Sequence, residues 1–164
     1  MCIVLVGLPA SSHCQDVAGQ QAQEQNLPLW VRSVFAKGGL DKTLSISYAI
    51  NPFYLRADFN GDGKLDIAVS IEKKGTGERG IAVVHSNDRS VYVLGAGNKV
   101  GSGWTDSRSL DVWCVYPTSI VALGAGETSI PILKGEALYV AKFGSSSGLI
   151  YWDGKQYRSY QQGD

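Results

Sequence analysis

Residues 54–71 read YLRADFNGDGKLDIAVSI, and this stretch decides the fold that the sequence predicts. Its two ends, 54–57 and 67–71, are rich in apolar and β-branched side chains, which favour strands. Between them DFNGDGKLD, residues 58–66, places carboxylate or amide side chains at almost every second position and contains two glycines. Because glycine adopts left-handed backbone angles without steric cost, the stretch predicts a tight loop that joins two antiparallel strands.

The rest of the chain continues this pattern of short apolar strands separated by turns. Glycine is abundant, with 20 residues, and aromatic residues make up 10% of the chain, as in β-rich domains with many turns. We expect further strands at 79–86, 90–95, 110–117, 119–124, 130–135 and 137–144, and a hairpin at 148–160. The prediction is a mainly β (α+β) fold, with antiparallel sheets of about eight to ten short strands and one short N-terminal helix.

The helix is expected within LPLWVRSVFAKGG, residues 27–39. Pro28 and Gly38 stand at positions that favour the start and the end of a helix. The side chains expected on its apolar face are Leu29, Val31, Val34 and Phe35.

Length and charge limit the possible functions. A chain of 164 residues is long enough for one domain with a sizeable core. Acidic and basic side chains balance at 15 each and form no basic stripe, which argues against nucleic acid as a partner. We divide the chain into a signal peptide with a flexible lead-in, 1–25, and a single β-rich domain, 26–164.

The beginning of the chain, MCIVLVGLPASSHC, is apolar and then rich in small residues, as at the end of a secretory signal peptide. Its apolar run is too short to span a bilayer, so we expect no transmembrane segment in the mature chain. The protein would then be exported, either to the periplasm or into the medium. The alternative is that these residues form a buried first strand.

The loop at 58–66 also offers a set of oxygen ligands: the side chains of Asp58, Asn60, Asp62 and Asp66, and the carbonyl of Lys64. Alternate positions of a tight loop can face one centre, and ligands that are all oxygen select a hard cation. Flexible coordination favours Ca²⁺ over Mg²⁺. We therefore predict that the loop binds one calcium ion.

Two other interpretations of this loop exist. The EF-hand loop begins with the same spacing, but its twelfth position needs a bidentate glutamate, and here that position is Val69. A metal-free turn, in which Asp and Asn side chains only cap backbone amides, stays open as the alternative to a calcium site. Three carboxylates crowded into such a turn would raise one another's pKa values and lower stability.

The pattern D-x-[DN]-x-D-G-x-x-D between strands, here Asp58 to Asp66, resembles the calcium loop of FG-GAP and VCBS-type proteins. The resemblance covers about fifteen to twenty residues and implies a calcium site rather than an activity. The Phe-Gly and Gly-Ala-Pro segments of that family are absent, and one copy cannot build a propeller. The whole chain is also similar to small bacterial exported proteins that share NPFYLR and GLIYWDGK segments, a likeness that implies no particular activity.

The hairpin at 148–160 carries the strongest turn signal, because Asp153-Gly154 lies between two aromatic runs. A two-residue primed turn there pairs Trp152 with Lys155. Both faces of the hairpin cannot easily be core, so the less buried face could bind a sugar, a peptide or a protein. The candidate contact residues are Tyr151, Trp152, Tyr157, Arg158 and Tyr160.

Other candidates for chemistry give weaker signals. His85 shares a strand face with Ile81 and Val83, which predicts a structural histidine with a satisfied hydrogen bond. Cys114 lies in an alternating strand and is expected to be a small buried side chain. Scattered carboxylates, whose spacing promotes no particular pair, are Glu72, Asp106, Asp111, Glu127 and Glu136.

These observations favour an exported, non-catalytic calcium-binding domain in which the ion has a structural role. Two alternatives stay open. One is an interaction or inhibitor protein of the cell envelope that uses the C-terminal hairpin. The other is a carboxylate-based hydrolase, although no nucleophile and base in the sequence form a recognisable pair, and no enzyme is expected.

Overall fold

The computed structural model describes residues 19, 23–101, 104–117, 121–124 and 126–163. The expected signal peptide and most of its lead-in lie outside these residues. Within the described chain, no helix is both long and apolar enough to cross a membrane.

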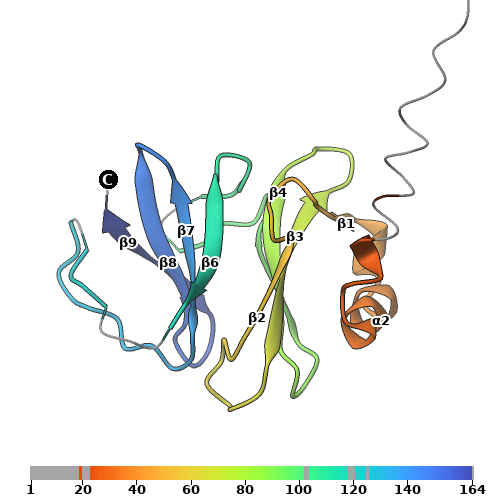
Figure 1. Ribbon diagram of the computed structural model, residues 1–164, viewed down its shortest axis with the longest axis horizontal. Helices are drawn as coiled ribbons and strands as arrows, with labels where there is room; N and C mark the ends of the chain where they lie inside the picture. Colours follow the sequence, from red (N-terminus) through yellow and green to blue (C-terminus); the bar gives the residue numbers. More distant parts are fainter. Residues whose placement is uncertain (1–18, 20–22, 102–103, 118–120, 125, 164) are drawn as a thin grey trace, which may run out of the picture.

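Nine strands of the described residues form two antiparallel sheets (Figure 1). The first sheet contains β1 (Leu44–Ile46), β2 (Tyr54–Ala57), β3 (Asp66–Lys73), β4 (Arg79–Val84) and β5 (Val91–Gly95). The second sheet contains β6 (Val112–Tyr116), β7 (Ala137–Lys142), β8 (Ser146–Trp152) and β9 (Tyr157–Gly163). With one short helix, α2 (Leu29–Lys37), this confirms the predicted mainly β fold class.

The two sheets are built from successive parts of the chain. In the first, β1 and β2 pair with successive halves of one edge of β3, and β4 and β5 follow on its other side. In the second, β6, β7, β8 and β9 pair in sequence order. The chain therefore passes from one sheet to the other once, between β5 and β6.

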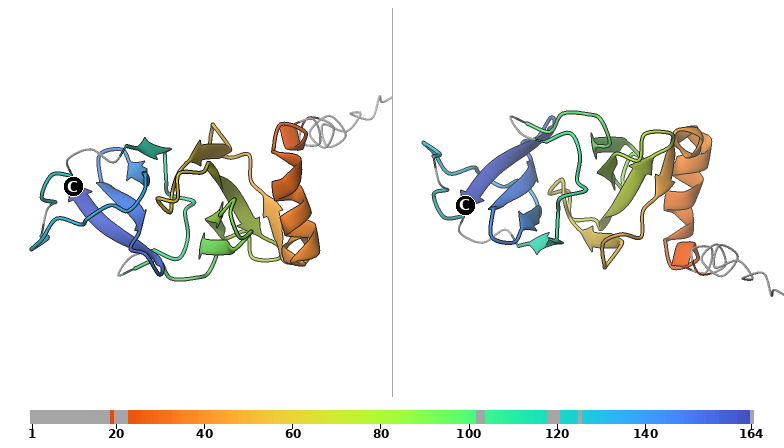
Figure 2. Two further views of the ribbon diagram at one scale, coloured as in Figure 1. Left: turned by 90° about the horizontal axis from the view of Figure 1, so that it is seen from below. Right: turned by 90° about the horizontal axis from the view of Figure 1, so that it is seen from above.

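The molecule has four layers, which follow one another from left to right in Figure 1 and again in the views of Figure 2. They are residues 121–124 with 126–133, the second sheet, the first sheet and α2. One apolar cluster fills the space between the sheets, where Phe59 and Val83 meet Trp113 and Leu138. A second cluster lies between the first sheet and α2, and a third lies under residues 121–124 with 126–133. Both sheets thus have packed layers on both faces, although the outer face of the second sheet is only partly covered at β6.

β3 is the centre of the first sheet, because it pairs with strands on both of its edges and has packed layers on both of its faces. Every residue from Asp66 to Ile71 is buried. This explains why its sequence is continuously apolar after Asp66 instead of alternating.

Helix α2 confirms the predicted boundaries, with Pro28 before its first residue and Gly38 after its last. Val31 and Phe35 face the first sheet and are buried. Leu29, however, is 70% exposed, so its predicted place on the apolar face is wrong. Leu27, just before the helix, is buried in its place and packs in the cluster between α2 and the first sheet.

The strands predicted at 119–124 and 130–135 are wrong, since the described residues of this segment contain no strand. The described residues of this segment instead cover part of the outer face of the second sheet. Val121 is buried there, and the N–H of Gly124 donates to the Tyr160 hydroxyl at 2.8 Å. Pro131 has no N–H to give to a ladder, and Ile132 is 83% exposed.

Cys114 is exposed, which corrects the prediction of a buried thiol. Its strand does alternate: Trp113 points into the core, so Cys114 points outward to a face that is only partly covered.

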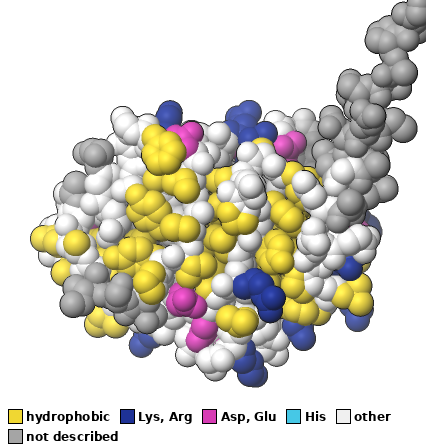
Figure 3. All heavy atoms as spheres, in the orientation of Figure 1, with side chains coloured by type: hydrophobic (Ala, Val, Ile, Leu, Met, Phe, Trp, Pro, Cys, Tyr) yellow, Lys and Arg dark blue, Asp and Glu magenta, His cyan; other side chains and the backbone are white. Residues whose placement is uncertain are grey.

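Figure 3 shows that apolar side chains occupy much of the middle of one molecular face, with charged side chains gathered mostly toward its margins.

Candidate functional site

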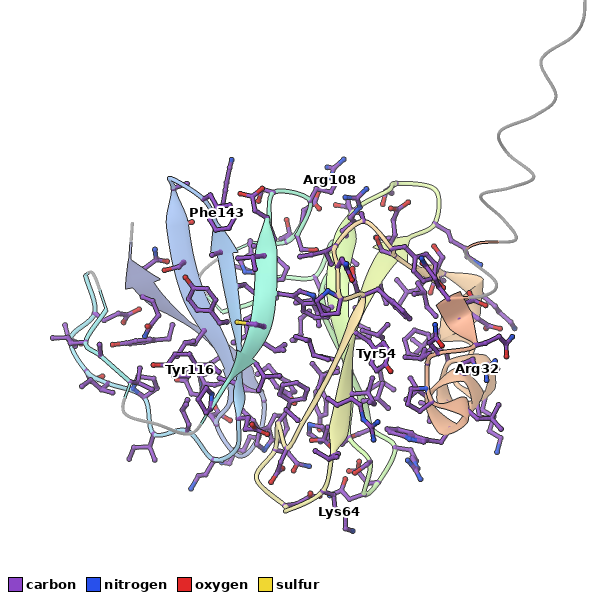
Figure 4. The ribbon with its side chains drawn as sticks, viewed as in Figure 1. Arg32, Tyr54, Lys64, Arg108, Tyr116 and Phe143 are labelled. Atoms are coloured by element: carbon purple, nitrogen blue, oxygen red, sulfur yellow. The ribbon has the colours of Figure 1, made fainter. Side chains whose placement is uncertain are left out.

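The aspartate-rich loop joins β2 to β3, as predicted. Ala57 pairs with Asp66, so Asp58 to Leu65 form an eight-residue connection between antiparallel strands. The loop lies at the lower end of the molecule in Figure 1, and Figure 4 places Lys64 at its outer tip, directed into solvent. The flanking strands confirm that this is not a helix–loop–helix unit.

Asp58 organises the first half of the loop. Its carboxylate accepts hydrogen bonds from the backbone N–H groups of Gly61 at 2.7 Å, Asp62 at 3.0 Å and Gly63 at 2.8 Å. Three successive N–H groups can point at one side chain because Gly61 and Gly63 have left-handed backbone angles, with φ of 80° and 81°. The loop therefore folds around the first aspartate of its sequence.

Asn60 and Asp62 bind each other and the backbone. The N–H of Asp62 donates to Asn60 Oδ1 at 2.9 Å, and Asn60 Nδ2 donates to Asp62 Oδ2 at 3.3 Å. The N–H of Lys64 donates to Asp62 Oδ1 at 2.9 Å. These contacts are the Asx-type turns that the metal-free interpretation requires, and they use only part of the acceptor capacity of the two side chains.

Asp66 differs from the other acidic residues of the loop because it is fully buried. Its Oδ1 accepts the N–H of Ser86 at 2.8 Å, but its Oδ2 is buried without any hydrogen-bond partner. The Ser86 hydroxyl is a second buried oxygen without a partner. Two buried oxygens without partners, in two residues that are joined by a hydrogen bond, are unusual, because buried polar groups nearly always have a hydrogen-bond partner.

The surroundings of Asp66 disfavour its charged form. Burial raises the pKa of its carboxyl above the ordinary value, and the nearby charge of Asp62 raises it further. The N–H groups of Ser86 and Asn60 and the charge of His85 act in the opposite direction. Two of the other predicted ligand residues, Asn60 and Asp62, thus lie close enough to Asp66 to affect its ionisation.

The connection that leads into β7, residues 134–136, holds the loop from the other side. The N–H of Glu136 donates to the Asp58 carbonyl at 2.7 Å, and the N–H of Asp58 donates to Glu136 Oε2 at 2.9 Å. A Cβ atom on Gly135 would lie 2.3 Å from the Asp58 carbonyl oxygen, and one on Gly61 would lie 2.1 Å from the Lys134 carbonyl oxygen. We call the contact of residues 134–136 with Asp58 and Gly61 the inter-sheet clasp.

The clasp is not predictable from the sequence. Local patterns place Glu136 only among the scattered surface carboxylates, although Gly135 beside it is a residue type that permits close backbone approach. The two halves of the clasp are 78 residues apart. Nothing in the local pattern of either half indicates the other.

An aromatic cluster lies behind Asp66 between the two sheets. It consists of His85, Tyr92, Trp152 and Tyr157, with ring centroids 4.8–5.9 Å apart. His85 Nε2 and the Tyr157 hydroxyl are 2.8 Å apart, which confirms the structural, hydrogen-bonded histidine. Burial raises the pKa of Tyr157, and the nearby charge of Asp66 raises it further.

The connection between the two strands of the C-terminal hairpin is longer than predicted. Trp152 pairs with Tyr157 rather than with Lys155, so the connection has four residues, 153–156. Asp153 Oδ1 accepts the N–H groups of Lys155 at 2.8 Å and Gln156 at 2.9 Å. This side-chain cap stabilises the wider loop, and the prediction of a two-residue primed turn is wrong.

The predicted interaction surface of this hairpin is largely internal. Tyr157 is only 7% exposed and Tyr160 only 5%, because the sheet is covered on both faces. The prediction that one face is free is therefore wrong for these two residues. Tyr151 and Trp152 are half-buried and Arg158 is exposed.

The carboxylates considered for hydrolysis each have a structural partner. Glu72 forms an ion pair with Arg79 at 3.3 Å, and Asp111 Oδ2 accepts the N–H of Phe143 at 2.8 Å. The other three accept backbone N–H groups. Asp106 accepts the N–H of Arg79, Glu127 accepts that of Gln161, and Glu136 accepts that of Asp58. They are thus spread over both sheets as parts of the scaffold.

The loop residues fit a cation in part. Within the described residues, no three Cys, His, Asp or Glu side chains form a cluster that would hold a metal by themselves. A cation in the loop would therefore need the Asn60 amide and the Lys64 carbonyl as well as the carboxylates. The chemistry of the donors suits Ca²⁺, and Asp66 Oδ2 is a buried oxygen without a hydrogen-bond partner among the described residues.

Comparison of the chain with protein-family models, curated proteins and solved structures finds no match. The resemblance to FG-GAP and VCBS-type loops accordingly rests on residues 58–66 and stays a prediction.

Proposed function

We propose that this chain is an exported, non-catalytic domain that binds one calcium ion in the loop from Asp58 to Asp66. The observation that carries the proposal is the buried Oδ2 of Asp66, which has no partner beside a loop rich in oxygen donors. A buried carboxylate without compensation costs several kcal/mol, and a cation would remove much of that cost.

The charges of the loop support the same proposal. Within the described residues, Asp58, Asp62 and Asp66 take part in no ion pair. The basic residue of the loop, Lys64, is exposed and points into solvent (Figure 4). The chain itself therefore supplies little positive charge to the three carboxylates, and a cation from solution could supply it.

The ion would have a structural role. The residues that would hold it are Asp58, Asn60, Asp62 and Asp66 by their side chains and Lys64 by its carbonyl; a bound Ca²⁺ supplies the positive charge that these groups share. Asp58 also binds Glu136 through its backbone, as part of the inter-sheet clasp. Fixing the loop would therefore fix the contact between the two sheets.

Export is supported by the expected weakness of such a site. Without a bidentate glutamate, a loop of this kind belongs with extracellular modules that bind calcium with a Kd of about 10⁻⁴–10⁻³ M. Such affinity is useful only where calcium is millimolar. The apolar beginning of the sequence favours the same location.

Thermal unfolding with calcium and with EDTA tests the proposal. With a Kd of about 0.1 mM, calcium at about 1 mM adds roughly 1.4 kcal/mol and raises the melting temperature by about 3–6 °C. Asp62→Ala should abolish the rise. Asp41→Ala, which removes an exposed aspartate of the short 3-10 helix η1 (Leu40–Lys42), should keep it.

Calorimetric titration of the same three proteins gives the stoichiometry, which should be one ion per chain for the wild type. A melting temperature that does not respond to several millimolar calcium would show that the four side chains only form turns. An equal rise in the Asp62→Ala variant would place the ion elsewhere.

The alternative function, binding of an envelope partner through the C-terminal hairpin, now rests on Tyr151, Trp152 and Arg158. Affinity capture from envelope extracts, with wild type and with Arg158→Gln plus Tyr151→Ala, tests it. A partner lost in the double variant would support this function over a purely structural calcium domain.

A further inference from the structure

A groove of about 510 Å³ lies between helix α2 and the β4–β5 hairpin, and no residue of the aspartate-rich loop lines it. Its apolar surface comes from side chains that are partly buried against the first sheet: Trp30, Val34, Leu40 and Val91. Its volume is within the range of roughly 300–1,000 Å³ that is typical of sites for small ligands. The groove therefore offers apolar surface of a useful size at the surface of the molecule.

The charged residues that line the groove are both basic, Lys37 and Arg89. Within the described residues neither forms an ion pair. Asp88, the sequence neighbour of Arg89, uses its Oδ1 to accept the N–H and the hydroxyl of Ser90 at 2.9 and 2.7 Å. The groove consequently combines an apolar floor with two positive charges that form no ion pair with any described acidic side chain.

Arg89 occupies a backbone position that usually takes glycine or asparagine. Its φ of 64° is left-handed, a conformation that a residue with a long side chain adopts only with backbone strain. Its guanidinium carbon lies 4.3 Å from the centre of the Trp30 ring, so the strained position holds the charge over the groove. A cation–π contact at an exposed site is weak, so the contact with Trp30 does not by itself account for an arginine here.

We propose that this groove binds an amphiphilic carboxylate, with an aliphatic chain on the apolar floor and the carboxylate at Lys37 and Arg89. An arginine can bind a carboxylate through two parallel N–H···O bonds, and a nearby lysine adds a second positive charge. Charge complementarity selects an anionic head group, and the floor selects an alkyl chain over a fully polar anion. The proposal is independent of the calcium loop.

Titration of the full chain with decanoate, followed by calorimetry and tryptophan fluorescence, tests the proposal. We expect saturable binding of one decanoate per chain, equal in calcium and in EDTA. Decanol, which has the same chain length and no charge, should bind at least tenfold more weakly, because loss of charge-assisted hydrogen bonds costs about that factor. Acetate, which has the head group without the chain, should not bind.

Variants of the two cations assign the site. Lys37→Gln and Arg89→Gln should each weaken decanoate binding about tenfold. Arg89→Gly is a second variant at the same position that also relieves the left-handed backbone, so it should fold at least as well as the wild type and still lose binding. Lys142→Gln and Arg56→Gln, which remove exposed cations of the second and first sheets, should bind like the wild type.

Three results would overturn the proposal: no saturable binding of decanoate, equal binding of decanol, or equal loss of affinity in the Lys142 and Arg56 variants. Binding to phosphatidylglycerol vesicles without binding of monomeric decanoate would also overturn it, since the basic groove would then be a contact for an anionic membrane surface.

Discussion

The chain makes two loops around an Asp-Gly sequence, and they handle negative charge in opposite ways. In the terminal hairpin, Asp153 accepts two backbone N–H groups and also forms an ion pair with Arg158. In the β2–β3 loop, Asp58 accepts three backbone N–H groups, but no basic side chain of the described residues pairs with it. The terminal hairpin thus neutralises its aspartate with its own residues, whereas no described basic side chain does so for the aspartates of the β2–β3 loop.

The two loops also differ in how tightly the rest of the molecule holds them. A Cβ on Gly154 would meet only the end of the Lys134 side chain, at 4.0 Å. A Cβ on Gly61 would meet backbone of the inter-sheet clasp at 2.1 Å. Substitutions should therefore have different effects in the two loops, with the largest loss of stability at the clasp.

Gly61→Ala should have the largest effect. It adds left-handed strain of about 1–2 kcal/mol and forces the clasp apart, at a further cost of about 1–3 kcal/mol. Gly63→Ala is the matched control, since its φ is nearly the same and a methyl group there would have no neighbour within 4 Å. Urea unfolding should show a loss of about 3 kcal/mol or more for Gly61→Ala and about 1–2 kcal/mol for Gly63→Ala. Equal losses would mean that the clasp does not restrain the loop.

Gly154→Val should have an intermediate effect. The φ of Gly154 is 104°, which a β-branched residue adopts only with strain, but the space around it is open. We expect a loss of about 1–3 kcal/mol in urea unfolding, with the response to calcium unchanged. A loss of the calcium response would indicate that the two loops are not separate.

Asp66→Asn should have opposite effects in EDTA and in calcium. In EDTA near pH 7 the variant should melt a few degrees above the wild type, because a neutral amide replaces a buried carboxylate of the same shape. In calcium it should lose the stabilisation of the wild type. Asp62→Asn, at an exposed position, should lose the calcium response with a smaller change in EDTA. If Asp66→Asn melts lower in EDTA, the buried charge is compensated by the chain.

The pH dependence of stability in EDTA should distinguish the two loops. The changes in stability should be smaller than those expected for the glycine and Asp66 variants. The pKa of Asp66 is raised in the native state, so the native state binds protons more readily than the unfolded chain, and stability should fall as pH rises above about 4. The pKa of Asp153 is lowered to about 2 by the N–H groups of Gln156 and Lys155 and by Arg158. Its contribution is therefore present above about pH 4 and is lost as pH falls toward 2.

Urea midpoints measured between pH 2 and 7 check these signs. Asp66→Asn should remove the decline in stability above pH 4. Asp153→Asn should remove part of the loss of stability that occurs as the pH falls toward 2. A variant at either position that leaves the profile unchanged would contradict the assignment for that loop.

The same contrast shows what the sequence could predict. The β2–β3 loop was predicted correctly as a connection between strands, because its glycines, its carboxylates and its flanking strand patterns are all local. The hairpin register was not predicted correctly because the Asp153 side chain accepts the N–H groups of Lys155 and Gln156, which lie beyond Gly154. An Asp-Gly pair in a sequence does not show whether the aspartate is a central residue of a two-residue turn or caps the backbone of a wider one.

The errors elsewhere have a related cause. Burial of Leu27 in place of Leu29, exposure of Cys114 and the absence of strands in the described parts of 119–135 depend on which layer covers which face. Hydrophobic periodicity predicts on which face of a helix or strand a side chain lies, but not which element packs against that face. The clasp between Asp58 and Glu136 is the clearest case, since no local pattern connects residues so far apart.

The distance along the chain that the clasp spans also has a kinetic consequence. Each sheet is made from its own continuous part of the chain and closes mainly short hairpins, while the clasp closes a connection of 78 residues. Contacts that close long loops tend to form late, because their entropy cost is met only after local structure exists. Weakening the clasp should therefore speed unfolding and leave the folding rate nearly unchanged. The lifetime of the native state, rather than the speed of reaching it, would then depend on the contact between Gly135 and the aspartate-rich loop.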